Sequence, residues 1–245
     1  MRYLILSDVH ANIDALEQVL ADAARHGAHR VLLLGDLVGY NADPNGVIAR
    51  IKGLAVEAAV RGNHDRVAAG LGTPANFNAA ARASAAATSA MLTQESRDYL
   101  RRLPPGPIAV SPLVEICHGT PFDEDEYVFD RLDAVNAIQS ASRPLCLFGH
   151  THTPFAMRMT GDEAAFPDVS DGSTFRIEEG NRYLVNVGSV GQPRDGDPRA
   201  AYGILDTDGP SLTCYRVAYP VERAGARIRE AGLPAGLASR LAVGR

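Results

Sequence analysis

The sequence of 245 residues has little of three features that would each point to a particular class of protein. It has only three cysteines, with no Cys-x-x-Cys pair among them, and two of them lie in apolar, strand-like runs. We therefore expect buried, reduced thiols without a redox role. It has no run of lysines and arginines, and its formal net charge is −5. This negative net charge argues against a basic surface that binds long nucleic acids.

Long apolar runs are also missing. Met1 and Arg2 lead into an apolar run at residues 3–6, which is far shorter than a secretory signal core and lacks a cleavage pattern. No later segment approaches the length of a membrane span, so we expect a cytoplasmic protein without membrane partners. Hydrophobic residues still make up 46% of the chain. That content supports one sizeable core and a single domain over residues 1–245.

The first part of the chain alternates apolar runs, polar loops and helical patterns. Residues 3–6 are predicted as a strand, and apolar positions with helical spacing follow between Asn12 and Gly27. Further strands are predicted at 30–34 and 57–60. This alternation is typical of a parallel α/β core, in which ligand sites gather at the carboxyl ends of the strands.

The remaining chain changes in character twice. Residues 66–104 are rich in alanine and are predicted to form a helical excursion from the sheet, which a proline-rich segment ends. From Ile108 onward, short β-type runs between Gly, Asp and Pro turns predict a second, mainly antiparallel sheet, with two helices near the C-terminus. The acidic run at 123–126 is predicted to be a solvated face.

Side chains that commonly bind metals follow five of the predicted strands. These loops carry Asp8 and His10, Asp36, Asn63 and His64, His118, and His150 and His152. Carboxylate, amide and imidazole donors suit Mn²⁺, Fe, Zn²⁺, Ni²⁺ or Co²⁺ better than Ca²⁺ or a thiolate cluster. The set is too large for one such ion with open positions but suffices for two ions that share a carboxylate. The positive charge left over favours an anionic substrate such as phosphate.

Five short motifs resemble, in the same order, those of the calcineurin-like metallophosphoesterases. They are Asp8-Val9-His10, Gly35-Asp36, Gly62-Asn63-His64-Asp65, His118-Gly119 and Gly149-His150-Thr151-His152. The later segment 186–195 resembles a loop of the small bacterial phosphodiesterase and diadenosine tetraphosphatase-like branch. The resemblance implies an α/β fold, a two-sheet β-sandwich flanked by helices in four αββα layers, with a dinuclear site at the sheet edges.

The resemblance also assigns roles to these residues. One ion would be bound by Asp8, His10 and His152, and the other by Asn63, His118 and His150, with Asp36 bridging the two. Mn²⁺ is the metal we expect first. The ions would activate a hydroxide for in-line attack on phosphorus, and His64 would act as the general acid. The expected substrates are small phosphate monoesters or diesters, with nucleotides as one candidate class.

Two positions depart from the family pattern. Ala11 follows the first motif where many relatives have glycine, a change that costs little unless the backbone there needs a positive φ. Gly39 and Tyr40 stand where protein Ser/Thr phosphatases carry an Asp-Arg pair that orients the catalytic histidine and grips phosphate. This second departure weakens the alternative of a Ser/Thr-type protein phosphatase.

Other residues are candidates for the two missing roles. Asp65 or Asp43 could orient His64, and Arg194 could supply the phosphate grip. Tyr40 and Asn41 are predicted to line the substrate cleft.

Two other classes of function remain open. A non-catalytic metal-binding scaffold or interaction module of the same fold would be expected to lack part of the ligand set or the catalytic histidine, and this sequence has all of them. A nuclease for long DNA would be expected to have a basic surface and an added DNA-binding domain. The sequence leaves the oligomeric state open.

Overall fold

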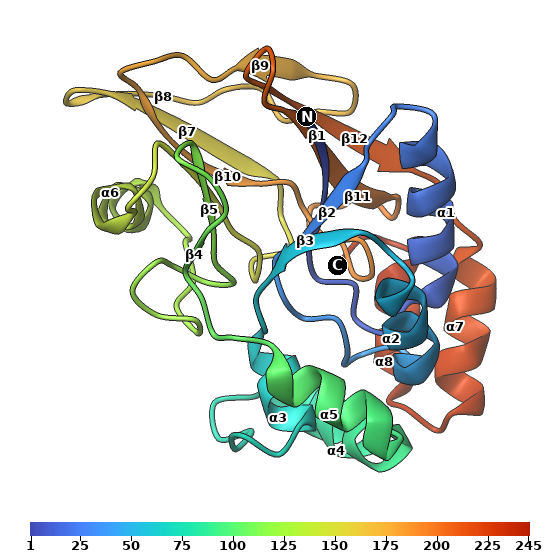
Figure 1. Cartoon of the computed structure of the whole chain (residues 1–245). Helices are drawn as coiled ribbons and strands as arrows, with labels where there is room; N and C mark the ends of the chain where they lie inside the picture. Colours follow the sequence, from blue (N-terminus) through green and yellow to red (C-terminus); the bar gives the residue numbers. More distant parts are fainter.

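In the computed structural model, which describes residues 1–245, two six-stranded sheets pack face to face between layers of helices (Figure 1). Sheet A contains β1 (Arg2–Leu6), β2 (Arg30–Leu33), β3 (Val56–Ala59), β9 (Thr174–Arg176), β11 (Ala200–Asp206) and β12 (Ser211–Val217). Sheet B contains β4 (Ile108–Ala109), β5 (Val114–Ile116), β6 (Leu145–Leu147), β7 (Phe155–Thr160), β8 (Glu163–Ala165) and β10 (Arg182–Asn186). The strand orders are β3-β2-β1-β11-β12-β9 and β4-β5-β6-β10-β7-β8.

Helices cover both outer faces and extend one end of the sandwich. Beside sheet A lie α1 (Ile13–Ala24), α2 (Pro44–Lys52), α7 (Val221–Glu230) and α8 (Ala235–Leu241), and beside sheet B lies α6 (Arg131–Ser140). The predicted helical excursion contains α3 (Asn63–Ala68), α4 (Ala79–Met91) and α5 (Gln94–Arg102), which sit together below the sheets in Figure 1. No helix combines the length and the apolar character needed to cross a membrane.

The apolar alternation of the strands explains the layers. In β1, Leu4 and Leu6 pack with the helices of the outer face, whereas Tyr3 and Ile5 pack in the core between the two sheets. A third apolar cluster joins sheet B to α6 and includes Phe148. Since successive side chains of a strand point to opposite faces, a strand segment covered on both sides must be apolar throughout, as residues 3–6 of β1 are. The expected αββα order of layers is confirmed.

The helix beside β1 begins where the sequence predicted. Asn12 caps α1, its side chain accepting a hydrogen bond from the backbone N–H of Ala15. In the same way Asp43 caps α2, whose first residue is Pro44. These caps fix the points at which the loops after β1 and β2 enter their helices.

The prediction of a second, mainly antiparallel sheet is wrong in its partition of the strands. β9, β11 and β12 extend sheet A, and β11 pairs antiparallel with β1. The reason is that β2 pairs with only one edge of β1, which leaves the other edge free for another strand. In sheet B, β10 pairs parallel with β6, so both sheets are mixed. The short strand β8 was not predicted.

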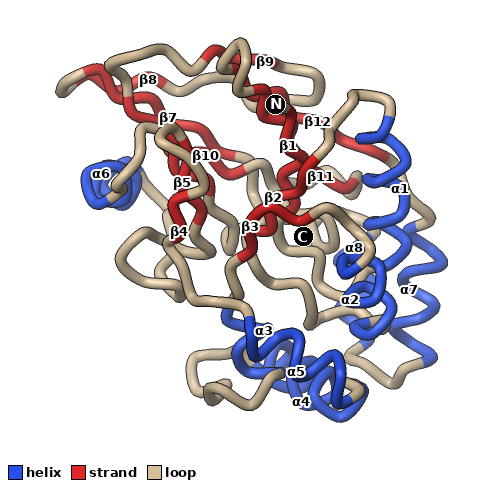
Figure 2. Tube along the Cα trace, viewed as in Figure 1, coloured by secondary structure: helices blue, strands red, loops and turns tan.

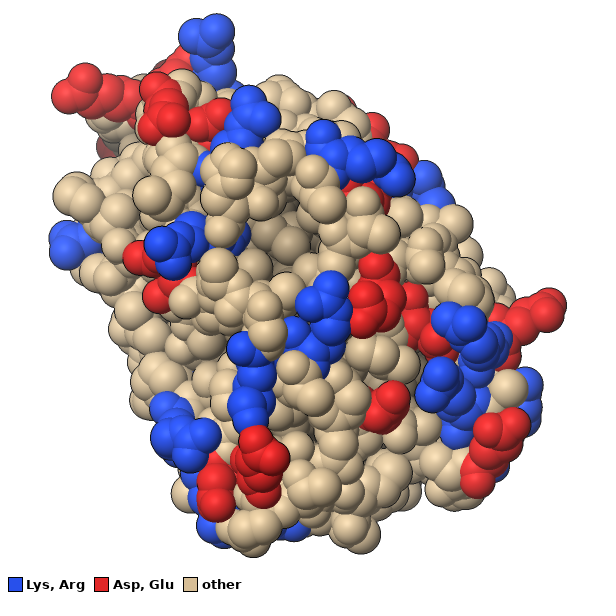
Figure 3. Space-filling view, turned by 45° about the vertical axis from the view of Figure 1, so that its right-hand side comes forward, with Lys and Arg blue, Asp and Glu red and all other residues tan.

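Parallel pairing places the polar loops at one end of the sandwich. β1, β2 and β3 run parallel in sheet A, and β5, β6 and β10 run parallel in sheet B. The loops that follow these strands gather between the strand ends and α3 (Figure 2). On the face shown in Figure 3, basic and acidic side chains are interspersed.

Candidate active site

Six of the predicted ligands form two groups that share one carboxylate. The first group is Asp8, His10, Asp36 and His152, and the second is Asp36, His118 and His150. Within each group the donor atoms lie within 4.8 Å of one another, and all six side chains are buried. Such a set of oxygen and nitrogen donors could hold a metal ion in each group.

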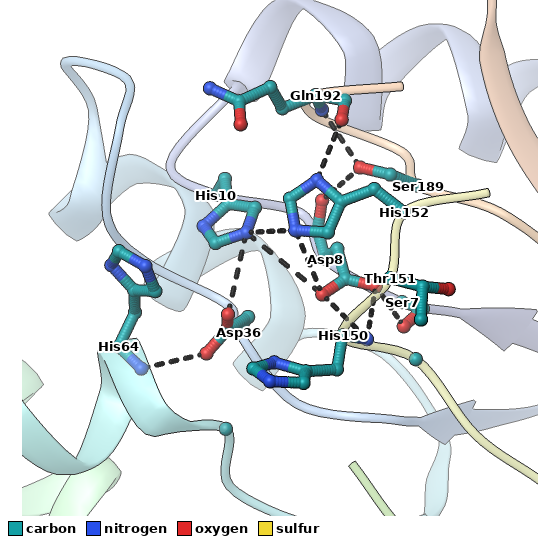
Figure 4. Close-up of polar contacts among 12 residues, drawn as sticks. Ser7, Asp8, His10, Asp36, His64, His150, Thr151, His152, Ser189 and Gln192 are labelled. Carbon is teal, nitrogen blue, oxygen red and sulfur yellow. Dashed lines mark hydrogen bonds and ion pairs between the residues drawn. The ribbon is translucent and has the colours of Figure 1, made fainter. Parts of the chain in front are cut away.

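Asp36 lies at the junction of the two groups (Figure 4). Its Oδ2 is 3.4 Å from Nε2 of His10 and 3.5 Å from Nε2 of His118. Its Oδ1 accepts a hydrogen bond of 2.9 Å from the backbone N–H of His64. One carboxylate oxygen is therefore held by the backbone while the other faces both groups.

Backbone carbonyls set the tautomers of three histidines. Their Nδ1 atoms lie within hydrogen-bond distance of carbonyl oxygens, in the pairs His10–Val38 (3.0 Å), His118–Leu34 (2.8 Å) and His152–Gln192 (2.7 Å). Because a carbonyl can only accept, Nδ1 carries a proton, and in the neutral ring Nε2 presents a lone pair to the site. These partners could not be predicted from the sequence, since any residue supplies a carbonyl.

The lone pairs of these rings face one another. Nε2 of His10 is 3.0 Å from Nε2 of His152, and Nε2 of His118 is 3.1 Å from Nδ1 of His150. Two acceptors this close are stable only if a proton or a cation lies between them. Asn63 adds an amide oxygen 3.3 Å from Nε2 of His118. This donor chemistry fits a pair of divalent cations.

The charges of the site lead to the same conclusion. Burial raises the pKa of Asp8 to about 6. Burial opposes protonation of His118, but attraction to Asp36 and Asp8 outweighs it and raises the pKa of that histidine to about 10. Burial also acts against the charge of Asp36, yet its histidine neighbours hold its pKa well below the usual value. The two buried carboxylates thus require nearby positive charge.

Left-handed backbone geometry aims these side chains. Positive φ angles occur at Asp8 (52°), His10 (48°), Ala11 (54°), Asp36 (52°), Tyr40 (58°), His150 (67°) and His152 (61°). Non-glycine residues adopt this region at a cost, so such clusters are typical of functional sites. Ala11 therefore has the positive φ at which alanine is costly and glycine is not.

Asp8 is held by neighbours from three loops. Ser7 Oγ donates to its Oδ2 at 2.5 Å, and the backbone N–H of His150 donates to both carboxylate oxygens at 3.2 Å. Ser189 Oγ donates to the backbone carbonyl of Asp8 at 2.8 Å. Ser189 lies in segment 186–195, which the sequence singled out, whereas no signal marked Ser7.

His64 lies beside the two groups, but neither expected carboxylate orients it. Asp65 instead accepts hydrogen bonds from the backbone N–H groups of Val38 and Gly62, both at 3.1 Å. Asp43 is engaged in capping α2. Nδ1 of His64 is buried without a hydrogen-bond partner, and burial lowers the pKa of the ring to about 4. Asn63 and His64 also form the first turn of α3 and not a loop.

A cavity of about 200 Å³ opens beside His64. Its lining includes Tyr40, His64, Phe77, Tyr127 and His150. The ring of Tyr127 stacks on His150 with centroids 3.8 Å apart. Neither Phe77 nor Tyr127 was singled out from the sequence, because a lone aromatic in a loop gives no sign of what it will contact.

The acidic run 123–126 is only partly the solvated face that its composition suggested, because Asp123 and Glu126 are exposed but Glu124 and Asp125 are not. Glu124 pairs with Arg61 and Arg66, and Asp125 also pairs with Arg66. The carbonyl of Asp125 accepts a hydrogen bond of 3.1 Å from Nε2 of His150. Ion pairing to the loop and helix after β3 therefore folds this run against the site.

The three residues predicted to contact the substrate lie in surroundings that differ from one another. The guanidinium carbon of Arg194 is 5.5 Å from the centroid of the Tyr40 ring, and Arg194 donates to Oε1 of Gln192 at 2.9 Å. Tyr40 lines the cavity. Asn41 is buried behind His10 and donates to the backbone carbonyls of His10 (2.8 Å) and Gly191 (3.3 Å). Its amide supports the loop and does not line the cavity.

Comparison with known proteins agrees with this geometry. The family model of the calcineurin-like phosphoesterase superfamily domain matches residues 1–209. The uncharacterized protein MJ0912 of Methanocaldococcus jannaschii is 32% identical over 248 residues, covering 98% of this chain and 97% of that protein. The phosphodiesterase YfcE of Escherichia coli is 26% identical over 217 residues, covering 85% and 89%. The crystal structure of a metallophosphoesterase from Sphaerobacter thermophilus matches with a TM-score of 0.87 at 39% identity, covering 100% of this chain and 99% of that chain.

Proposed function

The chain belongs to the calcineurin-like phosphoesterase superfamily, and on that premise we propose that it is a dinuclear metal-dependent phosphoesterase for small phosphate monoesters or diesters. The observation that carries this proposal is the position of Asp36, whose Oδ2 faces both groups of donors. Asp8, His10 and His152 would hold one ion, and Asn63, His118 and His150 the other. Mn²⁺ is the first candidate for both. The YfcE relative supports phosphodiesters as a substrate class.

When bound, the ions supply Lewis acidity toward a phosphoryl oxygen and lower the pKa of a water molecule. The residues of the chain provide the rest. Arg194 lies over Tyr40 and can bind the oxygens of a phosphate group in place of the missing family arginine. Tyr40 lines the cavity, where it would face the same substrate.

His64 is the proposed general acid. It lines the cavity beside the donor groups, where an alcohol leaving group has room. In the free protein burial favours its neutral form, since the pKa is about 4. A phosphate anion beside the ring favours the protonated form, which can pass its proton to the leaving oxygen. The products are an alcohol and a phosphate or phosphate monoester.

The alternative of a metal-binding scaffold is less well supported, because every donor and His64 itself are present and converge. Elemental analysis and turnover together test the proposal. Protein stripped with a chelator should lose hydrolysis of bis(p-nitrophenyl) phosphate and recover it with Mn²⁺, with about two ions bound per chain. Activity that chelation leaves unchanged would contradict the proposal. Metal uptake without hydrolysis of any phosphate ester would favour the scaffold.

A further inference from the structure

His64 has no hydrogen-bonding group to orient its ring. Its Nδ1 is buried without a partner, and the two carboxylates expected to orient it, Asp65 and Asp43, are engaged elsewhere. The backbone of Gly39, at φ +98°, approaches so closely that a Cβ there would lie 2.5 Å from Nδ1. A carboxylate side chain at position 39 would therefore require the ring to move.

Aromatic rings surround His64 instead. The Tyr40 centroid lies 4.4 Å from the His64 centroid with the planes at 48°, and the Phe77 centroid lies 4.5 Å away with the planes at 31°. The ring of His10 meets it edge-on at 5.0 Å and 86°. These separations are those of direct aromatic contact, in tilted and edge-on arrangements that aromatic pairs favour.

Phe77 is anchored independently of the metal ligands. It lies in the segment between α3 and α4, and its half-buried ring packs against the core cluster of sheet A and its helices. Tyr40, by contrast, follows β2 and its backbone N–H donates to Ser84 Oγ of α4 at 2.5 Å. The rings of Phe77 and Tyr40 therefore come from separate parts of the chain, and both are tied to the helical excursion.

We propose that Phe77 is a positioning residue that, with Tyr40, holds the ring of His64 in the orientation needed for proton donation. This inference rests on the proposed role of His64 as general acid. Packing here replaces the hydrogen bond from a carboxylate, and the segment before α4 thereby becomes part of the catalytic arrangement. The substitution Phe77→Leu keeps an apolar side chain but loses the flat ring face. It should let His64 rotate without disturbing the metal ligands.

Substrates with different leaving groups can distinguish a role of Phe77 in positioning the acid from its other possible roles. An acid matters most when the departing oxygen is basic, so methyl phenyl phosphate should depend on it more than methyl p-nitrophenyl phosphate. For Phe77→Leu we expect kcat on the phenyl ester to fall about tenfold with little change in KM, and much less loss on the p-nitrophenyl ester. Phe77→Tyr should restore the wild-type ratio. Phe166→Leu, at an exposed phenylalanine outside the cavity lining, is the matched control.

Three results would overturn the proposal. Equal losses on both esters would indicate that the substitution disturbs the site as a whole. A raised KM at unchanged kcat would indicate that Phe77 serves to bind the substrate. A Phe77→Leu change that lowers activity further in the His64→Ala background would show that Phe77 does not act through His64. If no variant or wild-type protein turns over either ester, the proposed function fails separately.

A crystal structure of Phe77→Leu tests positioning without turnover. We expect His64 in a second rotamer, with His10 and His118 unmoved. A single, unchanged His64 conformer would overturn the proposal whatever the activity.

Discussion

The backbone N–H of His64 donates a hydrogen bond of 2.9 Å to Oδ1 of Asp36, which links the proposed acid directly to the proposed bridging ligand. The same carboxylate presents its other oxygen to both donor groups. A change at Asp36 should therefore affect metal binding first and the position of His64 second.

Replacement of Asp36 tests the shared carboxylate. Asp36→Ala should bind at most one Mn²⁺ per chain, because each donor group loses its common oxygen. Asp36→Asn keeps the acceptor for the backbone of His64 but removes the charge, so we expect Mn²⁺ affinity to fall by at least about tenfold. Calorimetric titration measures both. Asp206→Asn, at a carboxylate that pairs with Arg2, is the matched control, and unchanged Mn²⁺ binding in Asp36→Ala would contradict the bridging role.

Arg194 is expected to bind the phosphate of the substrate. Arg194→Ala should lower kcat/KM by about 10- to 100-fold because a charged hydrogen-bond donor to the phosphate is lost. Mn²⁺ content should not change. Arg199→Ala is the control, since Arg199 pairs with Asp171 and Asp197, whereas Arg194 lies over the ring of Tyr40. Equal effects of the two changes on steady-state kinetics would show that Arg194 has no specific role.

The backbone conformation of Ala11 predicts that replacement by glycine does not destabilise the protein. At φ 54° a residue with a Cβ costs about 1–2 kcal/mol, whereas glycine does not. Ala11→Gly should therefore leave the free energy of unfolding unchanged or raise it by up to about 1 kcal/mol, despite the lost methyl group. Ala15→Gly, at an equally buried alanine inside α1, should lower it by about 1 kcal/mol or more. Urea unfolding compares the two, and equal destabilisation would show that Ala11 is not strained.

The three cysteines should resist thiol reagents in the folded protein. Cys117, Cys146 and Cys214 are buried and free. Burial raises the pKa of Cys214 from 9.0 to about 12, so at pH 8 it is almost entirely the unreactive thiol. We expect negligible labelling by an aromatic disulfide reagent in native buffer and complete labelling in guanidinium. Rapid labelling of any cysteine in the native protein would contradict this placement.

The candidate site could be located from the sequence because residues of metal-binding type stand directly after apolar runs. Asp8, Asp36 and His118 each follow an apolar run at which a strand could be expected to end. Parallel pairing then brought them together, and the left-handed backbone at Asp8 and Asp36 was the detail that sequence could not supply. The family and the layered fold were predicted correctly for the same reason.

Other features depend on contacts between distant residues. The pairing of β1 with β11 joins positions such as Leu4 and Ile204, and nothing in either segment alone specifies the partner. The position of Phe77 against His64 is also set by tertiary packing. The acidic run was misjudged at Glu124 and Asp125 because their arginine partners lie about 60 residues earlier in the chain.

Each donor group combines side chains from both sheets. Asp8 and Asp36 follow strands of sheet A, whereas His118, His150 and His152 follow strands of sheet B. An ion bound there would act as a reversible cross-link between distant segments, such as those of His10 and His152, which are 142 residues apart, and would stabilise the folded state over the open one. Scarcity of metal in the cell would then do more than stop turnover: it would expose the interior to proteases and shorten the lifetime of the protein.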